Sequence, residues 1–451
     1  MEGDTKPMKY VPIIGLETHI ELSTESKMFC GCSANYFGQK PNTHTCPVCL
    51  GLPGALPVAN KIAIESCIKI ALALNCTIAN ISKFDRKNYF YPDLPKGYQI
   101  SQYDMPFGEH GWIELSNGRK IGITRVHMEE DTGKLTHAEV DGQKVSLIDF
   151  NRSSVPLVEI VTDPDFHDAL EVKEYLQKLQ QIVRYLGVSN ADMEKGDMRL
   201  EPNISVAKTT DKKEISTLPP YKVEVKNINS FRFVEKAINF EVKRHIEILE
   251  KGDTPIQETR GWNENKNNTF SQRVKEEAND YRYFPEPDIP PFRFENSYIE
   301  ELKKQIPELP DLKTSRFISD YSLSDYDAEI LTREKNLADY FEEAVAVGKD
   351  HDVSSKQIAN IIINKKIDIT QVLPASLVKQ IVEENKVESI DESELNTLIS
   401  EVLKEHEKAV QDFKSGKESV IMFLLGQVMR KLGKKVDTQL VLAQIKSHLQ
   451  A

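Results

Sequence analysis

The chain has 451 residues, of which 39% are hydrophobic and 28% are charged, and this composition predicts a soluble protein of two or three domains. Its apolar stretches are too short to span a membrane, and its net charge of −12 does not favour nucleic-acid binding by the surface as a whole. The N-terminus lacks the basic and apolar regions of a signal peptide, so we expect a cytoplasmic protein. In that compartment the six cysteines are not expected to form disulfides.

The first predicted element is a strand over residues 11–22. Glu17, His19 and Glu21 fall at alternate positions, so their side chains point to one face, and apolar residues point to the other. Such alternation usually marks a strand that exposes one face to water. An imidazole between two carboxylates also suits half of a metal site, and the strand alone leaves both interpretations open.

Two pairs of cysteines follow, spaced as C-x-C, thirteen residues, and C-x-x-C. Four thiolates in paired knuckles are what a tetrahedral zinc site requires, so we predict bound zinc rather than free thiols. Four protein ligands leave no open position for a substrate, so the zinc would have a structural role and would crosslink a long polar loop. The predicted ligands are Cys30, Cys32, Cys46 and Cys49.

A helix is predicted over residues 60–75, and residues 83–102 after it are rich in cations and aromatic rings. The cations could hold phosphates and the rings a planar base. Taken alone, such a stretch is more often a loop that packs on the core with its cations in water. The cations are Lys83, Arg86, Lys87 and Lys96.

The densest group of ionisable residues follows an alternating strand predicted over residues 120–125. His127, Glu129, Glu130 and Asp131 combine one imidazole with three carboxylates. Neighbouring carboxylates repel one another unless a cation lies among them, and oxygen ligands with an occasional imidazole suit Mg²⁺ or Mn²⁺. A solvated acidic turn that binds nothing is the competing interpretation.

Residues 285–291 are rich in proline and predict a domain boundary, beyond which helical periodicity replaces the strand patterns. Residues 411–451 carry seven Lys or Arg and three acidic residues, so this end of the chain has a local charge of +4. It could contact a phosphate backbone, although a solvated helix end would be the commoner interpretation. Helices are expected over residues 302–306, 326–331, 337–347, 356–364, 395–413 and 420–429.

Several motifs closely resemble the B-subunit family of bacterial tRNA-dependent amidotransferases. They are long, rich in uncommon residues and spread over nearly the whole chain, so chance matching does not explain them. The matching segments are residues 15–22, 83–93, 98–102, 127–131, 149–152, 156–161, 203–205, 224–231 and 280–288.

The resemblance implies an α+β catalytic domain of the cradle type, with a largely antiparallel sheet, over residues 1–291 and a zinc knuckle inserted at residues 30–49. An all-α helical domain over residues 292–391 and a small all-α tail domain over residues 392–451, which contacts tRNA, would follow. Between about residues 368 and 391 the chain looks shorter than its relatives by something like a helical hairpin.

The resemblance also implies an ATP-dependent carbon–nitrogen ligase of protein biosynthesis that works in a heterotrimer with an A and a C subunit. The chain of this family phosphorylates the side-chain carboxylate of Glu-tRNA(Gln), Asp-tRNA(Asn) or both. Ammonia that the A subunit releases from glutamine then displaces the phosphate. The implied cofactors are ATP and Mg²⁺, beside the structural Zn²⁺ predicted from the cysteines.

By resemblance, Glu130, Lys87 and Glu129 serve catalysis, with Lys87 meeting phosphate and Arg86 a weaker candidate for the same contact. Glu201 stands where family members commonly have Asp, and its extra methylene would shift a direct metal contact, for example to one through water. The implied Mg²⁺ ligands are Glu17, His19, Glu130, Glu159, Glu224 and Glu201.

Two other classes of function compete with this one. A zinc-ribbon nucleic-acid-binding protein would need a basic knuckle, but Lys40 is the only Lys or Arg between residues 29 and 51. An ATP-dependent ligase that acts on a free small acid fits the carboxylates but leaves the basic C-terminal helices unexplained. Loss of tRNA affinity on deletion of residues 392–451 would separate this ligase from the tRNA-dependent enzyme.

Overall fold

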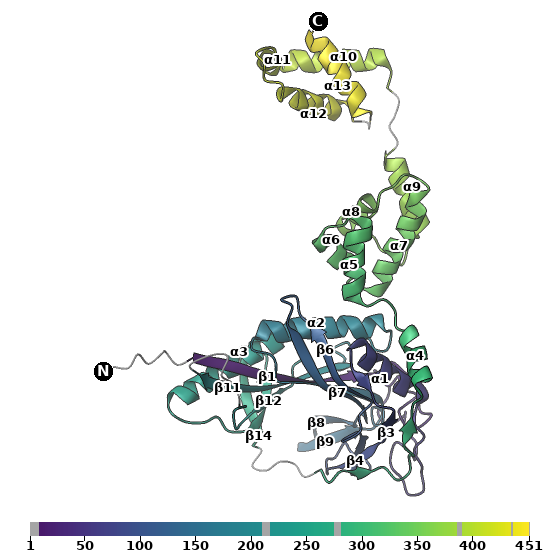
Figure 1. Ribbon diagram of the computed structural model, residues 1–451, viewed down its shortest axis with the longest axis vertical. Coiled ribbons are helices and arrows are strands. Elements are labelled where there is room, and N and C mark those ends of the chain that lie inside the picture. Colours follow the sequence, from purple (N-terminus) through teal and green to yellow (C-terminus); the bar gives the residue numbers. More distant parts are fainter. Residues whose placement is uncertain (1–8, 210–216, 275–280, 386–389, 434–435, 451) are drawn as a thin grey trace, which may run out of the picture. The chain divides into compact units, whose positions relative to one another are not determined.

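The computed structural model describes residues 9–209, 217–274, 281–385, 390–433 and 436–450. The chain divides into two compact units, Met1–Lys313 and Thr314–Ala451 (Figure 1). The helices of the described residues are α1 (Lys61–Ala73), α2 (Ala169–Tyr185), α3 (Phe231–Glu250), α4 (Asn296–Lys304), α5 (Pro310–Tyr321), α6 (Asp325–Leu331), α7 (Lys335–Lys349), α8 (Ser355–Lys365), α9 (Pro374–Asn385), α10 (Glu392–Glu405), α11 (Glu407–Lys414), α12 (Val420–Leu432) and α13 (Thr438–Gln450).

All strands described by the structure lie in the first unit. They are β1 (Lys9–Glu21), β2 (Thr77–Ile78), β3 (Ile81–Ser82), β4 (Asp85–Asn88), β5 (Tyr98–Ser101), β6 (Gly108–Glu114), β7 (Lys120–Glu130), β8 (Lys134–Val140), β9 (Gln143–Asp149), β10 (Pro156–Thr162), β11 (Met198–Thr209), β12 (Val223–Lys226), β13 (Glu258–Asn263), β14 (Asn268–Val274), β15 (Phe284–Pro285) and β16 (Phe292–Arg293).

A nine-stranded sheet in the order β14-β13-β12-β11-β1-β10-β7-β6-β2 forms the frame of the first unit. Of its neighbouring strand pairs, β12 and β13 run parallel and the others run antiparallel. Smaller sheets add β15-β4-β5, β16-β3 and the hairpin β8-β9. The predicted α+β class with a largely antiparallel sheet, followed by helical units, is confirmed.

The two faces of the central strands differ because successive side chains point to opposite sides. Ile14, Leu16 and Ile20 of β1 are buried in the core that also contains Leu176 of α2 and Ala237 of α3. Figure 1 shows α2 and α3 lying along this side of the sheet. The alternate residues of β1, which include the predicted site residues, therefore project from the face opposite these helices.

The first unit continues past the predicted boundary at residues 291 and 292. Glu286 is buried, and Ile289 belongs to the core of the first unit. Tyr298 of α4 donates a hydrogen bond of 2.6 Å to Glu65 of α1. The proline-rich segment thus packs against the rest of the first unit before the helical unit begins at Thr314.

The second unit is helical and contains two apolar cores, one built from residues 317–381 and one from residues 395–449. The single helix predicted over residues 395–413 was wrong: α10 and α11 meet at His406, whose φ of −118° and ψ of 46° leave the helical region. α5, α9 and α13 were not predicted. In the part of the chain described here, no helix is long and apolar enough to cross a membrane.

A buried polar network ties α3 to the edge strands. The carboxylate of Glu241 is fully buried, and it accepts hydrogen bonds from Arg244 Nη2 at 2.6 Å and pairs with His245 Nε2 at 3.1 Å and Arg260 Nε at 3.2 Å. Burial opposes this charge, but the hydrogen bonds from His245 and Arg244 lower the pKa of Glu241 to about 2. The network fixes β13 against the helix layer.

We expect Glu241→Ala to lower the free energy of unfolding of the first unit by about 3–5 kcal/mol, because it removes the buried carboxylate that Arg244, His245 and Arg260 share. Tryptophan fluorescence during urea unfolding measures this unit alone, since Trp112 and Trp262 both lie in it. The control is Glu247→Ala on the same helix, where the side chain is 58% exposed. Equal stability of the two variants would contradict a structural role for the network.

Candidate functional site

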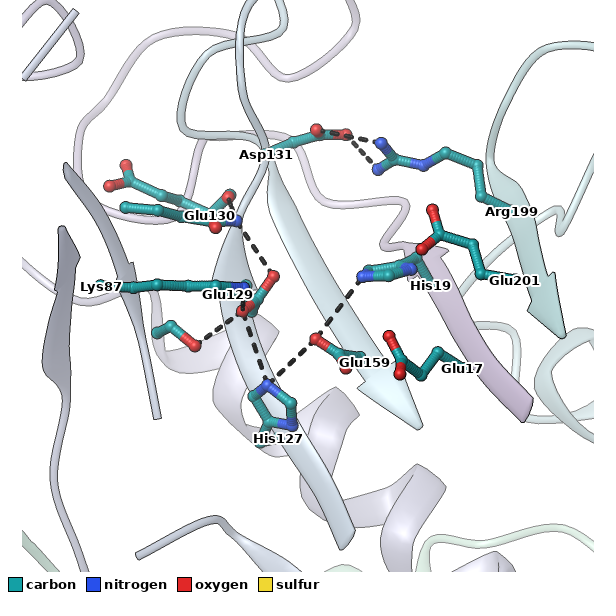
Figure 2. A network of polar contacts seen from close by, with 12 residues as sticks. Glu17, His19, Lys87, His127, Glu129, Glu130, Asp131, Glu159, Arg199 and Glu201 are labelled. Atoms are coloured by element: carbon teal, nitrogen blue, oxygen red, sulfur yellow. Dashed lines mark hydrogen bonds and ion pairs between the residues drawn. The ribbon is translucent and has the colours of Figure 1, made fainter. Parts of the chain in front are cut away.

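The register of the main sheet aligns side chains from four strands in one row. His127 on β7 pairs with Glu159 on β10, Glu159 pairs with His19 on β1, and His19 pairs with Arg199 on β11. Directly paired residues of an antiparallel sheet share a face. The four side chains therefore converge on the face opposite α2 and α3, where Figure 2 shows them.

The carboxylate of Glu159 lies between two imidazoles. Its Oε2 atom is 3.5 Å from His19 Nε2 and 3.3 Å from His127 Nε2. Glu129, two residues beyond His127 on the same face, places Oε1 3.6 Å from His127 Nε2. Possible ligand atoms of His19, Glu129 and Glu159 all lie within 4.8 Å of one another, and we refer to these three residues as the first cluster.

Lys87 and the residues of β5 hold Glu129 in place from the other side. Lys87 Nζ lies 3.4 Å from Glu129 Oε1, as Figure 2 shows. Ser101 Oγ donates to the same oxygen at 2.7 Å, and Gln99 Nε2 donates to Glu129 Oε2 at 3.0 Å. Hydrogen bonds of this kind orient a carboxylate ligand. The first cluster thus has a fixed geometry with an ammonium group beside it.

A second cluster lies on the neighbouring strands. Glu17 on β1 is the ladder partner of Glu201 on β11, and carboxylate oxygens of Glu17, Glu201 and Glu224 lie within 4.8 Å of one another. Lys226 Nζ is 2.9 Å from Glu201 Oε2 and 3.3 Å from Glu224 Oε1. Thr259 Oγ1 donates to Glu224 Oε2 at 2.8 Å. One lysine therefore partly neutralises three carboxylates.

The charges of the two clusters are strongly coupled. Burial and the charges of Glu159, Glu201 and Glu224 raise the pKa of Glu17. Burial opposes the charge of Glu129, but Lys87 and the hydrogen bond from His127 lower its pKa to about 2. Burial favours neutral His19, yet Glu159 and Glu201 raise its pKa to about 9. The carboxylates of the site are thus balanced by neighbouring imidazole and ammonium groups.

Glu130 lies apart from both clusters, although it neighbours Glu129. Side chains alternate along β7, so Glu130 points away from the row in Figure 2. Its Oε1 atom is 2.5 Å from Lys96 Nζ and accepts a hydrogen bond of 2.9 Å from Ile100 N. Asp131, directly after β7, forms an ion pair of 2.5 Å with Arg199, which belongs to the row. The predicted metal contact of Glu130 stays a prediction.

Among the predicted phosphate-binding cations, Arg86 and Lys83 have other partners. Arg86 forms a bidentate pair with Glu286, with Nε–Oε2 and Nη2–Oε1 distances of 2.7 and 2.8 Å, and its guanidinium lies 4.4 Å from the centre of the Tyr98 ring. Lys83 pairs with Asp85 and Asp104. Lys87 is the one of these three that contacts the first cluster.

Several residues that complete the site were not among those that the sequence motifs indicated. Lys226 lies two positions after Glu224, and Arg199 lies two positions before Glu201. Because side chains two positions apart on a strand share a face, this spacing could have indicated that each cation lies beside its acid. Gln99 gave no such pattern, since its role depends on β5 lying beside the end of β7. That contact joins elements distant in the sequence and is visible only in the fold.

The four predicted zinc ligands come together. Possible ligand atoms of Cys30, Cys32, Cys46 and Cys49 lie within 4.8 Å of one another, so the cysteines could bind a metal ion such as zinc. Buried Lys27 donates to His44 O at 2.7 Å and lies 3.7 Å from Cys49 Sγ. The hydrogen bond from Cys30 is the main reason that the pKa of Cys49 falls to about 5.

Comparison with known proteins identifies the family. Residues 12–300 match the model of the GatB/GatE catalytic domain, and residues 332–449 match that of the GatB domain. The chain belongs to the amidotransferase B-subunit family. The first match contains both clusters and the four cysteines, and the second covers most of the helical unit. The resemblance predicted from the motifs is confirmed.

Individual relatives match over nearly their whole length. The B subunit of the aspartyl/glutamyl-tRNA(Asn/Gln) amidotransferase of Thermoanaerobacter sp. (strain X514) is 46% identical over 486 residues, which cover 98% of this chain and 100% of that protein. The protein of the same name from Thermotoga petrophila is 45% identical over 475 residues, covering 96% of this chain and 98% of the relative. Both alignments exceed 451 residues, so they contain gaps in this chain.

The geometry of the family's catalytic domain in this chain suits chemistry on phosphate groups. Two groups of carboxylates, one with an imidazole, offer hard ligands for divalent cations, and Lys87 adds a fixed positive charge. Phosphoryl transfer depends on positioning and on neutralisation of charge more than on covalent catalysis by the protein. Cations held by these carboxylates would supply that neutralisation beside Lys87.

Proposed function

We propose that this chain is the component of a tRNA-dependent amidotransferase that activates the side-chain carboxylate of Glu-tRNA(Gln), Asp-tRNA(Asn) or both with ATP. The observation that carries this proposal is the first cluster, in which two buried carboxylates and an imidazole face the ammonium of Lys87. The names of the relatives support the choice of aminoacyl-tRNA as substrate.

Activation is needed because a carboxylate is a poor electrophile. A side-chain carboxylate oxygen attacks the γ-phosphorus of ATP, the bond from that phosphorus to the β–γ bridging oxygen breaks, and ADP leaves. Ammonia then attacks the acyl carbon of the acyl phosphate, loses a proton and expels inorganic phosphate, which leaves the amide. The protein must hold both substrates in line and neutralise the charge on the transferred phosphoryl group.

The residues of the two clusters take the binding roles in this proposal. His19, Glu129 and Glu159 would hold one Mg²⁺, and Glu17, Glu201 and Glu224 would form a second set of ligands. Bound Mg²⁺ supplies charge neutralisation to the phosphate oxygens. Lys87, which lies beside Glu129 on β4, would contact the same phosphate oxygens, and Ser101 and Gln99 keep Glu129 oriented. Glu130 would join the ligands only by leaving Lys96.

The proposal includes partners for the other steps. The amidotransferase A and C subunits would complete a heterotrimer, and the A subunit would release ammonia from glutamine. Misacylated tRNA would contact the C-terminal helices, where the basic residues include Lys414 and Arg430. Lys434 and Lys435 of the same basic group lie outside the described residues.

The test is product formation by the complex reconstituted with its A and C subunits. The assay supplies ATP, Mg²⁺ and ammonium, which makes it independent of glutamine, together with Glu-tRNA(Gln), Asp-tRNA(Asn) or free glutamate. We expect at least one of the two aminoacyl-tRNA substrates to give ADP and an amidated aminoacyl-tRNA. We expect no product from free glutamate. Turnover of free glutamate alone would favour a ligase that acts on a small acid.

We also propose that the four clustered cysteines bind structural zinc. Cys46→Ser should lower the zinc content from about one ion per chain to well below that value, and it should lower the unfolding temperature, because the ion crosslinks residues 30–49. Metal analysis by mass spectrometry and calorimetry measure the two effects. Cys67→Ala is the control, since Cys67 is fully buried in α1 and lies outside the cluster. Unchanged zinc in the Cys46 variant would contradict the assignment.

A further inference from the structure

A lysine without exposed surface lies beside the four clustered cysteines. The side chain of Lys27 is fully buried, which is rare for lysine unless its ammonium group is paired with an opposite charge. Among the described residues, no carboxylate lies within ion-pair distance of Lys27. A buried charge without a partner is costly, so another group near Lys27 must supply the negative charge.

Three acceptor atoms surround the ammonium of Lys27, which has three N–H donors. The backbone oxygens of His44 and Phe150 lie 2.7 and 3.4 Å from Lys27 Nζ, and Cys49 Sγ lies 3.7 Å from it. A backbone carbonyl is a dipole without net charge. Cys49 Sγ is therefore the one of these three atoms that can carry a negative charge, as a thiolate.

Cys49 differs from the other three cysteines in its surroundings. It is fully buried, whereas Cys30, Cys32 and Cys46 are partly exposed. Its sulfur also accepts a hydrogen bond of 3.1 Å from Cys46 N. Hydrogen bonds to the charged form of a group favour that form. Four thiolates exceed the charge of one Zn²⁺, and at Cys49 this surplus negative charge is not screened by water.

We propose that Lys27 is a positioning residue of the zinc site, which neutralises part of the thiolate charge and holds Cys49 as a ligand. The proposal rests on the proposed zinc site and adds a residue outside the four ligands. His44 lies between the two cysteine pairs, and Phe150 directly follows β9. The hydrogen bonds to these two residues fix the ammonium beside Cys49, as the outer partners of a metal ligand commonly do.

The competing role for Lys27 is a crosslink between loops that does not involve the metal. A neutral amide would suffice for that role and would avoid burial of a charge. Asn151 provides such a link in the same region: its Oδ1 accepts a hydrogen bond of 2.8 Å from His44 N, and its Nδ2 donates one of 2.7 Å to Lys40 O. A buried ammonium beside a cysteine thus points to the charge of the thiolates.

The first test compares zinc affinity in full-length Lys27→Met and wild-type chains. Competition with a chelator of known affinity measures the Kd for Zn²⁺. We expect the Kd to rise about 10- to 100-fold in the variant, the usual effect of removing a group that orients a metal ligand. Lys40→Met is the control, because Lys40 lies in the same knuckle but is exposed, and it should keep the wild-type Kd.

The absorption spectrum of the cobalt-substituted chain shows whether the ammonium acts on the sulfur itself. A positive charge beside Cys49 lowers the energy of the sulfur electrons and moves the sulfur-to-cobalt charge-transfer band to shorter wavelength. Lys27→Met should therefore shift this band to longer wavelength, and Lys40→Met should leave it in place. A weaker zinc affinity with an unchanged band would overturn the proposal, because it would show an effect on the loop alone.

A double-mutant cycle with Cys46→Ser separates the two roles by stability. Lys27→Met should lower the unfolding temperature of the zinc-loaded wild type and have little effect in the Cys46→Ser background, which lacks the metal. Equal losses in both backgrounds, or a Lys27→Met chain that does not fold where Cys46→Ser does, would overturn the proposal in favour of a crosslink.

The outcomes also separate the role of Lys27 from the zinc site. A wild-type Kd for Zn²⁺ in Lys27→Met would overturn the role of Lys27 and leave the zinc site standing. A wild-type chain that binds no zinc would contradict the zinc site and the role of Lys27 together.

Discussion

Lys87→Met should lower the rate of ADP formation by about 100- to 1,000-fold, the usual effect of removing a preorganised charge that faces a transition state. The expectation follows from the position of Lys87, whose Nζ atom lies 3.4 Å from Glu129 Oε1. The ammonium is held beside the first cluster before any substrate arrives. Its loss should affect kcat more than the KM for ATP, since charge accumulates on the phosphoryl oxygens during transfer.

The control for this variant is Lys83→Met. Lys83 precedes β4, and its ion pairs with Asp85 and Asp104 keep its ammonium away from the first cluster. We expect this variant to retain kcat within a few-fold of the wild-type value. Single-turnover measurements with ammonium as nitrogen donor report the phosphoryl step directly. A Lys87 variant with wild-type kcat would show that this ammonium does not face the transferred group.

The second large effect concerns metal affinity and its dependence on pH. Without a metal ion, Glu159 is the main reason that the pKa of His19 is raised to about 9, although burial opposes the charge. A cation that binds the first cluster must displace this proton. Below the raised pKa, the apparent Kd for Mn²⁺ should therefore fall about tenfold for each unit of rising pH, between about pH 6 and 8.

Glu159→Gln should weaken Mn²⁺ binding by more than about 100-fold, because it removes a charged ligand between two imidazoles. Titration with detection of free Mn²⁺ by electron paramagnetic resonance measures both effects. Glu21→Gln is the matched control, since Glu21 shares the face of β1 but bonds to Tyr36 at 2.9 Å. Equal affinity in the two variants, or no pH dependence in wild type, would contradict this description of the cluster.

Much of the site could be predicted because β-strand periodicity is local. Glu17 and His19 lie two positions apart on β1, so the sequence predicts that they share a face. Glu224 likewise lies in a segment, β12, whose alternating pattern is visible in the sequence. The cysteine spacing is equally local, and the four residues do come together. The resemblance added residues from separate strands, which periodicity cannot assign to one site.

The choice between Glu129 and Glu130 could not be made from the sequence. The two residues are adjacent, and the acidic run contains no reason to prefer one. The antiparallel register aligns His127 with Glu159 and thereby places Glu129 on the same face of the sheet. Register depends on pairing between strands that lie far apart in the chain. The ion pair between Glu130 and Lys96 also depends on contacts between segments that are distant in the sequence.

The helical half shows a similar limit. Apolar periodicity correctly predicted α7, α8 and α12. It also predicted one continuous helix across His406, where the chain in fact turns from α10 to α11. The turn has no proline or glycine at the junction to mark it. Packing of both helices against α12 in a small core favours the break over a continuous helix.

The most direct test of the phosphoryl-transfer site is the ammonium-driven assay with Glu129→Gln in the reconstituted complex. Glu114→Gln, at the exposed end of β6, is the control. We expect the Glu129 variant to fold and assemble with the A and C subunits but to lose nearly all formation of ADP and amidated tRNA, while the control keeps both. Full activity of the Glu129 variant would show that the first cluster is structural and that phosphate transfer takes place elsewhere.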